Sequence, residues 1–352
     1  MRSVATRGLQ SARREPQGAW RGYALRFTAW ADWPDEDCAY PGAQVDALGD
    51  HLQECLQPLV DVALHEVLPD ASDAALLRFV AQRWAQTAAP TWSRLHVRST
   101  ESAGADLSAD GVVLLWRRYR LRCAHYLPHV PMGHKCGRLH GHDFDVVVHA
   151  RWDEQVPDHD ALDALWAPWH MRLNYQQLNG MQGLENPTSE NLSSWLWHGL
   201  RADIPGLSGV TVFETASCGA HFDGAEYRIW KDFSFDSATR HACAPPDQPQ
   251  ARVHGHTYQL RLVLQAPLDA YMGWLVDFGD VKRAFAPVFD SVDHRPLFER
   301  PQLERGDAAV IAGFIHEQAR EVLPMVERTV VLDPEGGGCE VAPVDRFLPL
   351  PP

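Results

Sequence analysis

The stretch Cys123–Val148 reads CAHYLPHVPMGHKCGRLHGHDFDVVV. It contains four residues of the types that bind metals or act as nucleophiles: His125, Cys136, His140 and His142. The alternating run Asp143–Val148, which follows the last histidine, predicts a strand. Because residues two apart on a strand share a face, we expect the imidazoles of His140 and His142 to converge.

A second alternating run, Leu114–Tyr126, predicts the hairpin partner and brings His125 alongside these two imidazoles. Three neutral imidazoles are the ligand set of a catalytic zinc, with the fourth position open to water or substrate. Cys136 lies in the intervening loop beside Lys135 and His134, where a divalent cation is expected to lower its pKa and make it a base or nucleophile. One alternative stays open: a surface histidine-rich loop with a structural zinc, which Cys136 would close as fourth ligand.

The composition is that of a globular protein without a basic face. The chain has 352 residues, 45% apolar residues and a formal net charge of −14, which argues against nucleic-acid binding. Its seven cysteines are an odd number without framework spacing, which suits a reducing cytoplasm. No apolar run has the length of a membrane span. The arginine-rich segment 1–18 is expected to be an unstructured tail.

Self-similarity predicts three tandem repeats. The run Gly111–Leu121 resembles Gly224–Phe235, and the His-Gly-His triplet returns at His254–His256. A third copy is expected at the front, where Tyr23–Trp30 predicts a strand and Ala19–Arg21 takes the place of the triplet. We therefore divide the chain into a tail, three units and a second tail, at 1–18, 19–110, 111–229, 230–346 and 347–352.

Helical periodicity and cap residues follow the strands of each repeat. We expect helices over Val45–Val67, from Asp70–Ser72 to about Thr87, from an N-cap at Thr188 to about Leu200, over Val281–Val292 and over Ala308–Val322. A strand should follow each second helix, at Arg94–Arg98, Gly209–Phe213 and Arg328–Leu332. The apolar stripes of these helices are interpreted as core.

Three strings together resemble the 6-carboxytetrahydropterin synthase branch of the 6-pyruvoyltetrahydropterin synthase family: Lys135–His142, Gly183–Glu190 and Phe213–Thr215. The three-residue gap between Cys136 and His140 matches the carboxy branch, which acts in queuosine biosynthesis, better than the pyruvoyl branch. The resemblance implies an α+β tunnelling fold (T-fold). Three tandem units, the first degenerate, would close an antiparallel barrel with the helices outside, and two barrels would stack.

The same resemblance implies roles for individual residues. Zinc would be held by His125, His140 and His142, Cys136 would act as a base, and Glu214 would anchor the pterin. Thr215, Lys135 and Arg138 are further candidates for substrate contact, although solvation of two surface cations accounts equally well for Lys135 and Arg138.

The family's proton-transfer pair is Asp-His, in a Leu-Asp-His-x-x-Leu-Asn motif after the first helix. The second repeat has Asn174 and Tyr175 there, neither of which replaces an imidazole, whereas the third repeat keeps Asp293 and His294. The first repeat is interpreted as keeping only His65, preceded by Leu64.

The other site positions show complementary losses. The third repeat has Thr239 for the first zinc histidine, Gln250 for the cysteine and Asp333 for the pterin anchor, and the first repeat has Ser99 for that anchor. If sites form between adjacent units, one chain builds one complete site from two repeats. A residual metal at His254–His256, helped by His241, is not expected.

These observations predict a cytoplasmic, zinc-dependent lyase acting on 7,8-dihydroneopterin triphosphate and releasing triphosphate and acetaldehyde. A pyruvoyl-type lyase and a non-catalytic pterin-binding or structural subunit remain as alternatives. The expected partner is the small pterin triphosphate, without nucleic acid or membrane. The expected assembly is a homodimer of pseudo-trimers.

Overall fold

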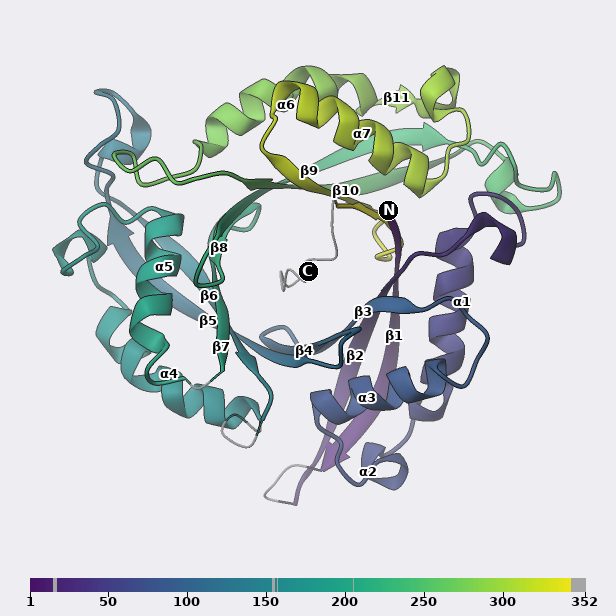
Figure 1. Ribbon diagram of the computed structural model, residues 1–352, viewed down its shortest axis with the longest axis horizontal. Helices are drawn as coiled ribbons and strands as arrows, with labels where there is room; N and C mark the ends of the chain where they lie inside the picture. Colours follow the sequence, from purple (N-terminus) through teal and green to yellow (C-terminus); the bar gives the residue numbers. More distant parts are fainter. Residues whose placement is uncertain (15–17, 154–155, 157, 205, 343–352) are drawn as a thin grey trace. The chain divides into compact units, whose positions relative to one another are not determined.

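The computed structural model describes residues 1–14, 18–153, 156, 158–204 and 206–342, and it shows three repeats of one ββααββ pattern (Figure 1). The first repeat contains β1 (Arg2–Arg14), β2 (Trp20–Ala31), α1 (Gln44–Leu56), α3 (Asp73–Trp84), β3 (Trp92–Thr100) and β4 (Ala103–Ser108). The second contains β5 (Val113–His125), β6 (His140–Arg151), α4 (His159–Leu173), α5 (Ser189–Leu200), β7 (Leu207–Thr215) and β8 (Cys218–Phe222). The third contains β9 (Tyr227–Thr239), β10 (His254–Gln265), α6 (Phe278–Val292), α7 (Ala308–Val322), β12 (Val326–Leu332) and β13 (Gly338–Val341).

This pattern confirms the expected α+β class and tunnelling-fold architecture. The repeats have antiparallel strand pairs at both ends and two helices between them, and α5 begins at the predicted Thr188 cap, whose Oγ1 accepts the Asn191 N–H at 3.1 Å. The predicted strand after each second helix is present as β3, β7 and β12. The predicted C-terminal tail, residues 347–352, lies outside the described residues.

Residue contacts divide the described chain into two compact units that do not follow the repeats. The first unit comprises residues 1–111, 232–262 and 283–342, and the second comprises residues 112–231 and 263–282. The second repeat therefore shares its unit with residues 263–282 of the third repeat. Within the described residues, no helix is long and apolar enough to cross a membrane.

In the second unit, two helices cover one face of the sheet formed by β5, β6, β7 and β8 (Figure 1). Helix α4 packs on β5, and α5 packs on β7 and β8. The core beside them includes the indole rings of Trp116 and Trp230, both fully buried, with Val147 and Phe213. Each buried aromatic side chain removes a large apolar surface from water, which fixes the register of the strands that carry the site.

The expected N-terminal tail is wrong, because residues 2–14 form strand β1. This strand pairs with β2 from Ser3 opposite Ala31 to Arg14 opposite Trp20, and it also pairs with β13. Two of its arginines are paired with buried carboxylates: Arg2 donates to Glu340 at 2.8 Å, and Arg13 donates to Asp73 at 2.6 Å. The boundary placed at 230 is also wrong, since β9 already begins at Tyr227.

The single helix expected over Val45–Val67 is broken in the structure. Helix α1 ends at Leu56, a 3-10 turn follows over Gln57–Leu59, and the short α2 spans Leu64–Val67. Pro58 lies in that turn, and a proline cannot continue the hydrogen-bond ladder of an α-helix. The apolar periodicity over Val45–Val67 thus comes from two separate helices, α1 and α2, each of which buries leucine side chains in the core.

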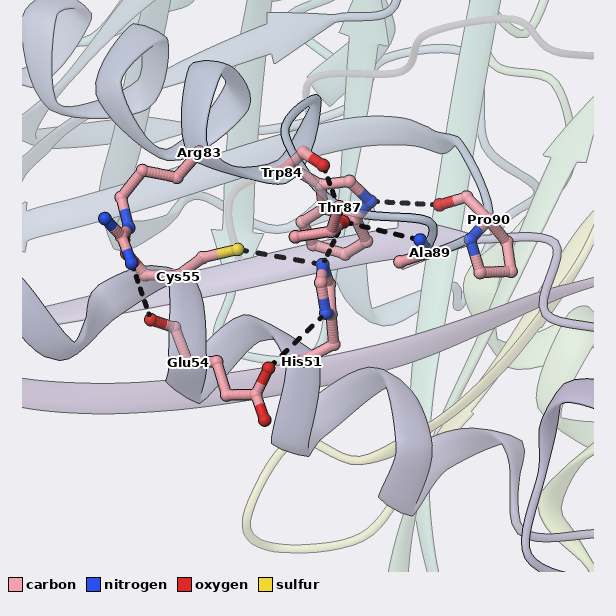
Figure 2. Close-up of polar contacts among 8 residues, drawn as sticks. All are labelled: His51, Glu54, Cys55, Arg83, Trp84, Thr87, Ala89 and Pro90. Carbon is pink, nitrogen blue, oxygen red and sulfur yellow. Dashed lines mark hydrogen bonds and ion pairs between the residues drawn. The ribbon is translucent and has the colours of Figure 1, made fainter.

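The two helices of the first repeat are joined by a polar and aromatic cluster (Figure 2). The Nε2 of His51 lies 3.7 Å from the Sγ of Cys55, and the Arg83 guanidinium donates to the Cys55 carbonyl at 3.0 Å. The Trp84 indole N–H donates to the Pro90 carbonyl at 2.9 Å and its ring packs edge-on against His51. Cys55 is buried, so this cluster stabilises α1 against α3 and offers no accessible thiol.

Candidate active site

Three imidazoles meet at the ends of β5 and β6 in the second unit. The strand register places His125 directly opposite His140 and Cys123 opposite His142, so the three histidines share one face. Their ring centroids lie 4.5 to 5.2 Å apart. The ligand nitrogens of all three lie within 4.8 Å of one another. The structure thus brings together the three histidines chosen from the sequence.

Hydrogen bonds fix the orientation of two of these rings. The Nδ1 of His125 lies 2.8 Å from the Pro187 carbonyl, and the Nδ1 of His140 lies 2.7 Å from the Arg138 carbonyl. A carbonyl only accepts, so each Nδ1 carries the proton and each Nε2 presents a lone pair. Backbone contacts of this kind are the usual means by which proteins orient metal-binding histidines.

Two of the three imidazoles have a buried Nε2 with no hydrogen-bond partner, at His125 and His142. Burial lowers the pKa of both side chains, which keeps the rings neutral. An unpartnered buried nitrogen costs stability unless something binds it, and neutral imidazole is the form that binds zinc. The residues present therefore fit a zinc ion held by His125, His140 and His142.

Glu214, near the end of β7, lies beside these rings. Its Oε1 is 3.5 Å from the Nε2 of His142, and its Oε2 accepts the Ser189 hydroxyl at 2.7 Å. The neighbouring Thr215 is exposed, and its hydroxyl lies 3.0 Å from the Sγ of Cys218. One carboxylate oxygen is therefore held by α5, while the other faces the three histidines.

Cys136 lies in the 3-10 turn Lys135–Gly137, between the two strands that carry the histidines. In the protein without metal, burial and then the charge of Glu214 raise the pKa of Cys136, and the lowering expected from a divalent cation stays a prediction. The charge of Lys135, whose side chain is exposed, lowers this pKa, but burial and Glu214 outweigh it. The side chain of Arg138 is also exposed.

Two acidic residues that the sequence did not assign to the site lie in the same unit. Asp277 has its Oδ2 3.5 Å from the Nε2 of His134, two residues before Cys136. Glu190 accepts the Leu275 N–H at 2.9 Å, and burial raises the pKa of Glu190 to about 7. Glu190 ends the Gly183–Glu190 string that resembles the family, so that string was a signal for it, whereas Asp277 belongs to none of the three strings.

The proton-transfer pair of the third repeat is intact in the first unit. The Nδ1 of His294 lies 3.0 Å from the Oδ2 of Asp293, and this hydrogen bond raises the pKa of His294. His294 adopts a left-handed φ of 52°, and its N–H donates to the Asp236 carbonyl at 2.6 Å. Cys136 belongs to the other unit, so its partnership with this pair stays a prediction.

The equivalent of His294 in the first repeat is Asp61, and the assignment to His65 is wrong. Asp61 has the same left-handed conformation, with φ of 54°, and its N–H donates to the Gln10 carbonyl of β1 at 2.9 Å. Tyr175 holds this place in the second repeat, as predicted, with φ of 62°. The prediction treated Val45–Val67 as one continuous helix, whereas the structure breaks it between α1 and α2. The position equivalent to His294 therefore lies before α2, at Asp61, and not at His65 within it.

The first repeat has no histidine at the zinc positions, and the expected match to Ala19–Arg21 is wrong by two residues. Bridges from Ala12 to Ala63 and from Ala124 to Gln177 mark the same strand position in the two repeats. One residue further on, Arg13 pairs with Arg21 where His125 pairs with His140. The matching triplet is therefore Arg21-Gly22-Tyr23.

Three further residues that replace site residues in the first and third repeats form hydrogen bonds within the protein. Ser99 donates to Asp73 at 2.6 Å in the first repeat, and Thr239 donates to the Gly306 carbonyl at 3.0 Å in the third. At Asp333, which takes the place of the pterin anchor, Oδ1 accepts the N–H of Glu335 and of Gly337. This carboxylate closes its own turn, so half of its hydrogen-bonding capacity is used.

The sequence matches the family described as 6-pyruvoyl tetrahydropterin synthase twice, over residues 114–225 and 228–342. The 6-carboxy-5,6,7,8-tetrahydropterin synthase of Synechocystis sp. is 34% identical over 120 residues, which cover 31% of this chain and 92% of that protein. The two copies of the family correspond to the second and third repeats of the structure.

Two solved structures are similar at a lower level. The 6-pyruvoyl tetrahydropterin synthase of Caenorhabditis elegans has 18% identity and a TM-score of 0.29, over 33% of this chain and 95% of that chain. Uricase from Arthrobacter globiformis has 11% identity and a TM-score of 0.31, over 61% of this chain and 80% of that chain. Both scores are below 0.5, so neither supports a conclusion about this chain. The two family matches together span more than half of the sequence, and on that ground the chain belongs to the 6-pyruvoyl tetrahydropterin synthase family.

Proposed function

We propose that this protein is a zinc-dependent lyase of the 6-carboxytetrahydropterin synthase type, acting on 7,8-dihydroneopterin triphosphate. The observation that carries the proposal is the group of three oriented imidazoles, His125, His140 and His142, with Glu214 beside them. The Nε2 atoms of His125 and His142 are buried and make no hydrogen bond, although that of His142 lies 3.5 Å from Glu214, and this suits a site that a metal completes. The name of the Synechocystis relative and the spacing of Cys136 and His140 favour the carboxy branch.

In this proposal each side chain has a distinct task. Glu214 accepts the N–H donors of the pterin ring, with one oxygen held in place by Ser189. A zinc ion on the three histidines would supply a Lewis acid that stabilises negative charge on the substrate's side-chain oxygens. The Cys136 thiolate removes a proton from a side-chain carbon, and triphosphate and then acetaldehyde leave. Burial and Glu214 raise the pKa of the Cys136 thiol in the metal-free protein. A cation bound nearby would lower that pKa and so favour the thiolate.

The proton donor is assigned to His294, oriented by Asp293. The second repeat has Asn174 and Tyr175 at the equivalent positions, and neither group exchanges protons near neutral pH. The raised pKa of His294 suits an acid that must hold its proton until the substrate needs it.

Product analysis tests the proposal directly. Zinc-loaded protein is incubated with 7,8-dihydroneopterin triphosphate, and the pterin and any acetaldehyde are identified, with His140→Ala as the metal-free control. We expect 6-carboxytetrahydropterin and one acetaldehyde per turnover. A pyruvoyl pterin without acetaldehyde would assign the protein to the pyruvoyl branch. Absence of turnover by protein that binds zinc and pterin would make it a non-catalytic subunit.

The proposed setting is the cytoplasm, with a product that feeds queuosine biosynthesis. All seven cysteines are free thiols, and the net charge of −14 suits a small-molecule enzyme rather than a nucleic-acid-binding protein. Lys135 and Arg138, both exposed near the thiol, are proposed contacts for the triphosphate.

A further inference from the structure

A segment of the third repeat, Tyr271–Asp277, lies against the second repeat within the second unit, and we name it the strap. Two hydrogen bonds join it to the loop before α5, from Asn186 Nδ2 to the Met272 carbonyl and from Thr188 Oγ1 to the Gly273 carbonyl. A third joins it to the first turn of α5, from the Leu275 N–H to Glu190 Oε1. The strap is thus fixed to the loop whose Pro187 carbonyl orients His125.

Gly273 allows this close approach. Its φ of 72° is left-handed, and a Cβ at this position would overlap the side-chain amide nitrogens of Asn186 and Asn191. Only glycine adopts such a conformation without strain and also leaves room for the neighbouring side chains. The backbone of the strap therefore lies close to side chains of the second repeat, and the ring of its Tyr271 stacks on His129 with the ring centroids 4.7 Å apart.

The strap ends at Asp277, which makes two different contacts. Its Oδ1 accepts the N–H of Gly279 at 2.7 Å and of Asp280 at 3.2 Å, and so caps the start of α6. Its Oδ2 lies 3.5 Å from the Nε2 of His134. Since the helix holds one oxygen of the carboxylate, the other has a fixed position relative to His134.

His134 links Asp277 to the turn that carries Cys136. Its Nδ1 accepts the Cys136 N–H at 3.2 Å. A ring that accepts at Nδ1 carries its proton on Nε2 when neutral, and that proton faces Asp277. The contacts therefore run from the helix cap through Asp277 and His134 to the backbone of Cys136.

We propose that His134 and Asp277 are positioning residues for Cys136, so that the third repeat holds the catalytic loop of the second. The inference rests on the proposed function. A thiol that removes a proton from carbon must be placed accurately, and a misplacement of about 1 Å can cost a hundredfold in rate. Residues that hold such a group through its backbone act without touching the substrate.

The degenerate site of the third repeat lacks the histidine of this pair. Counting back from His254 as from His140 places Gln250 at the thiol position and Gln248 at the position of His134. Gln250 contacts Asp46 instead, with Nε2 3.3 Å from its carboxylate. The histidine that contacts Asp277 thus occurs in the repeat that has the thiol, and glutamine replaces it in the repeat that has lost the thiol.

Asp277→Asn tests the proposal without removing the helix cap. The Asn Oδ1 can still accept from Gly279 and Asp280, which places the amide NH2 opposite the Nε2–H of His134. Two donors then face each other and the contact opens. We expect kcat to fall roughly ten- to a hundredfold with KM, zinc content and melting temperature unchanged. Asp280→Asn is the matched control, since Asp280 is exposed in the same helical turn, and it should retain full activity.

His134→Asn supplies a second variant. A shorter amide can still accept the Cys136 N–H in a local turn, but it cannot reach Asp277. We expect His134→Asn to match Asp277→Asn in kcat, and the double variant to lose no more than either alone. Equal losses in Asp280→Asn, or additive losses in the double variant, would overturn the proposal.

Hydrogen exchange at the Cys136 amide separates this inference from the proposed reaction. In the wild type that N–H is bonded to His134, so Asp277→Asn should speed its exchange several-fold while Asp280→Asn should not. If the wild type makes no pterin product but the exchange changes as expected, the proposed function fails and the positioning role stands. Unchanged exchange and unchanged kcat in Asp277→Asn would reject the positioning role.

Discussion

His294 and Tyr175 occupy the same backbone position in two repeats. Each has a left-handed φ, 52° and 62° respectively, and each donates its N–H to a carbonyl of the first strand of its own repeat. A left-handed backbone is uncommon for residues other than glycine, so its recurrence marks this place independently of the side chain. One fold position thus carries an acid-base group in the third repeat and a phenol in the second.

The first prediction is that His294→Ala loses most turnover. Removal of a positioned acid-base group costs about a hundred- to ten-thousandfold, and zinc content and fold should be unchanged because the side chain is exposed. His65→Ala is the control, since the structure assigns His65 to no equivalent position, and it should be nearly silent. Steady-state rates on zinc-loaded protein decide this, and the opposite order of the two variants would show that the pairing of repeats is wrong.

The second prediction is one zinc per chain. Only the second repeat, among the described residues, brings three histidine ligand atoms within 4.8 Å of one another. His140→Ala should abolish binding, and His254→Ala, the equivalent change in the third repeat, should leave it intact. Elemental analysis gives the stoichiometry. Two or three zinc ions per chain would contradict the interpretation of Thr239 as a lost ligand.

The third prediction concerns Glu190, whose pKa burial raises to about 7. The folded protein binds this proton more tightly than the unfolded chain, so stability is greatest below the unfolded pKa and falls as pH rises toward 7. Glu190→Gln keeps the oxygen that accepts the Leu275 N–H and removes the buried charge. It should stabilise the protein by about 1–3 kcal/mol at pH 8 and have little effect at pH 4.

Denaturant titrations of wild type and Glu190→Gln at these two pH values measure the effect. Glu226→Gln is a control, since this carboxylate is part-exposed and ion-paired with Arg228 at 2.6 Å. A Glu190→Gln variant that is less stable at pH 8 would mean that the carboxylate is favourably ionised in the folded state.

The fourth prediction concerns assembly. Three tandem repeats in one chain replace three separate chains, so the stacked species expected for this family becomes a homodimer. Light scattering should give twice the 39.5 kDa chain mass. A hexamer of this chain would reject the pseudo-trimer interpretation.

The sequence alone identified the residues whose spacing is local. His140 and His142 are two apart on a strand, and the period of a strand places both on one face whatever lies around it. The N-cap at Thr188 and the helix that follows were likewise predicted correctly, because a cap depends on the next three residues.

Tertiary structure decided what depends on distant partners. The arginines of residues 2–14 suggested a tail, but Asp73 and Glu340 pair with two of them and a twelve-residue register with β2 makes the segment a strand. The thiol pKa of Cys136 also follows from burial and from Glu214, 78 positions later, which no local pattern reveals. Local geometry is set by covalent spacing, whereas electrostatics and pairing are set by whatever the fold brings near, and the contact of Asp277 with His134 belongs to the second kind.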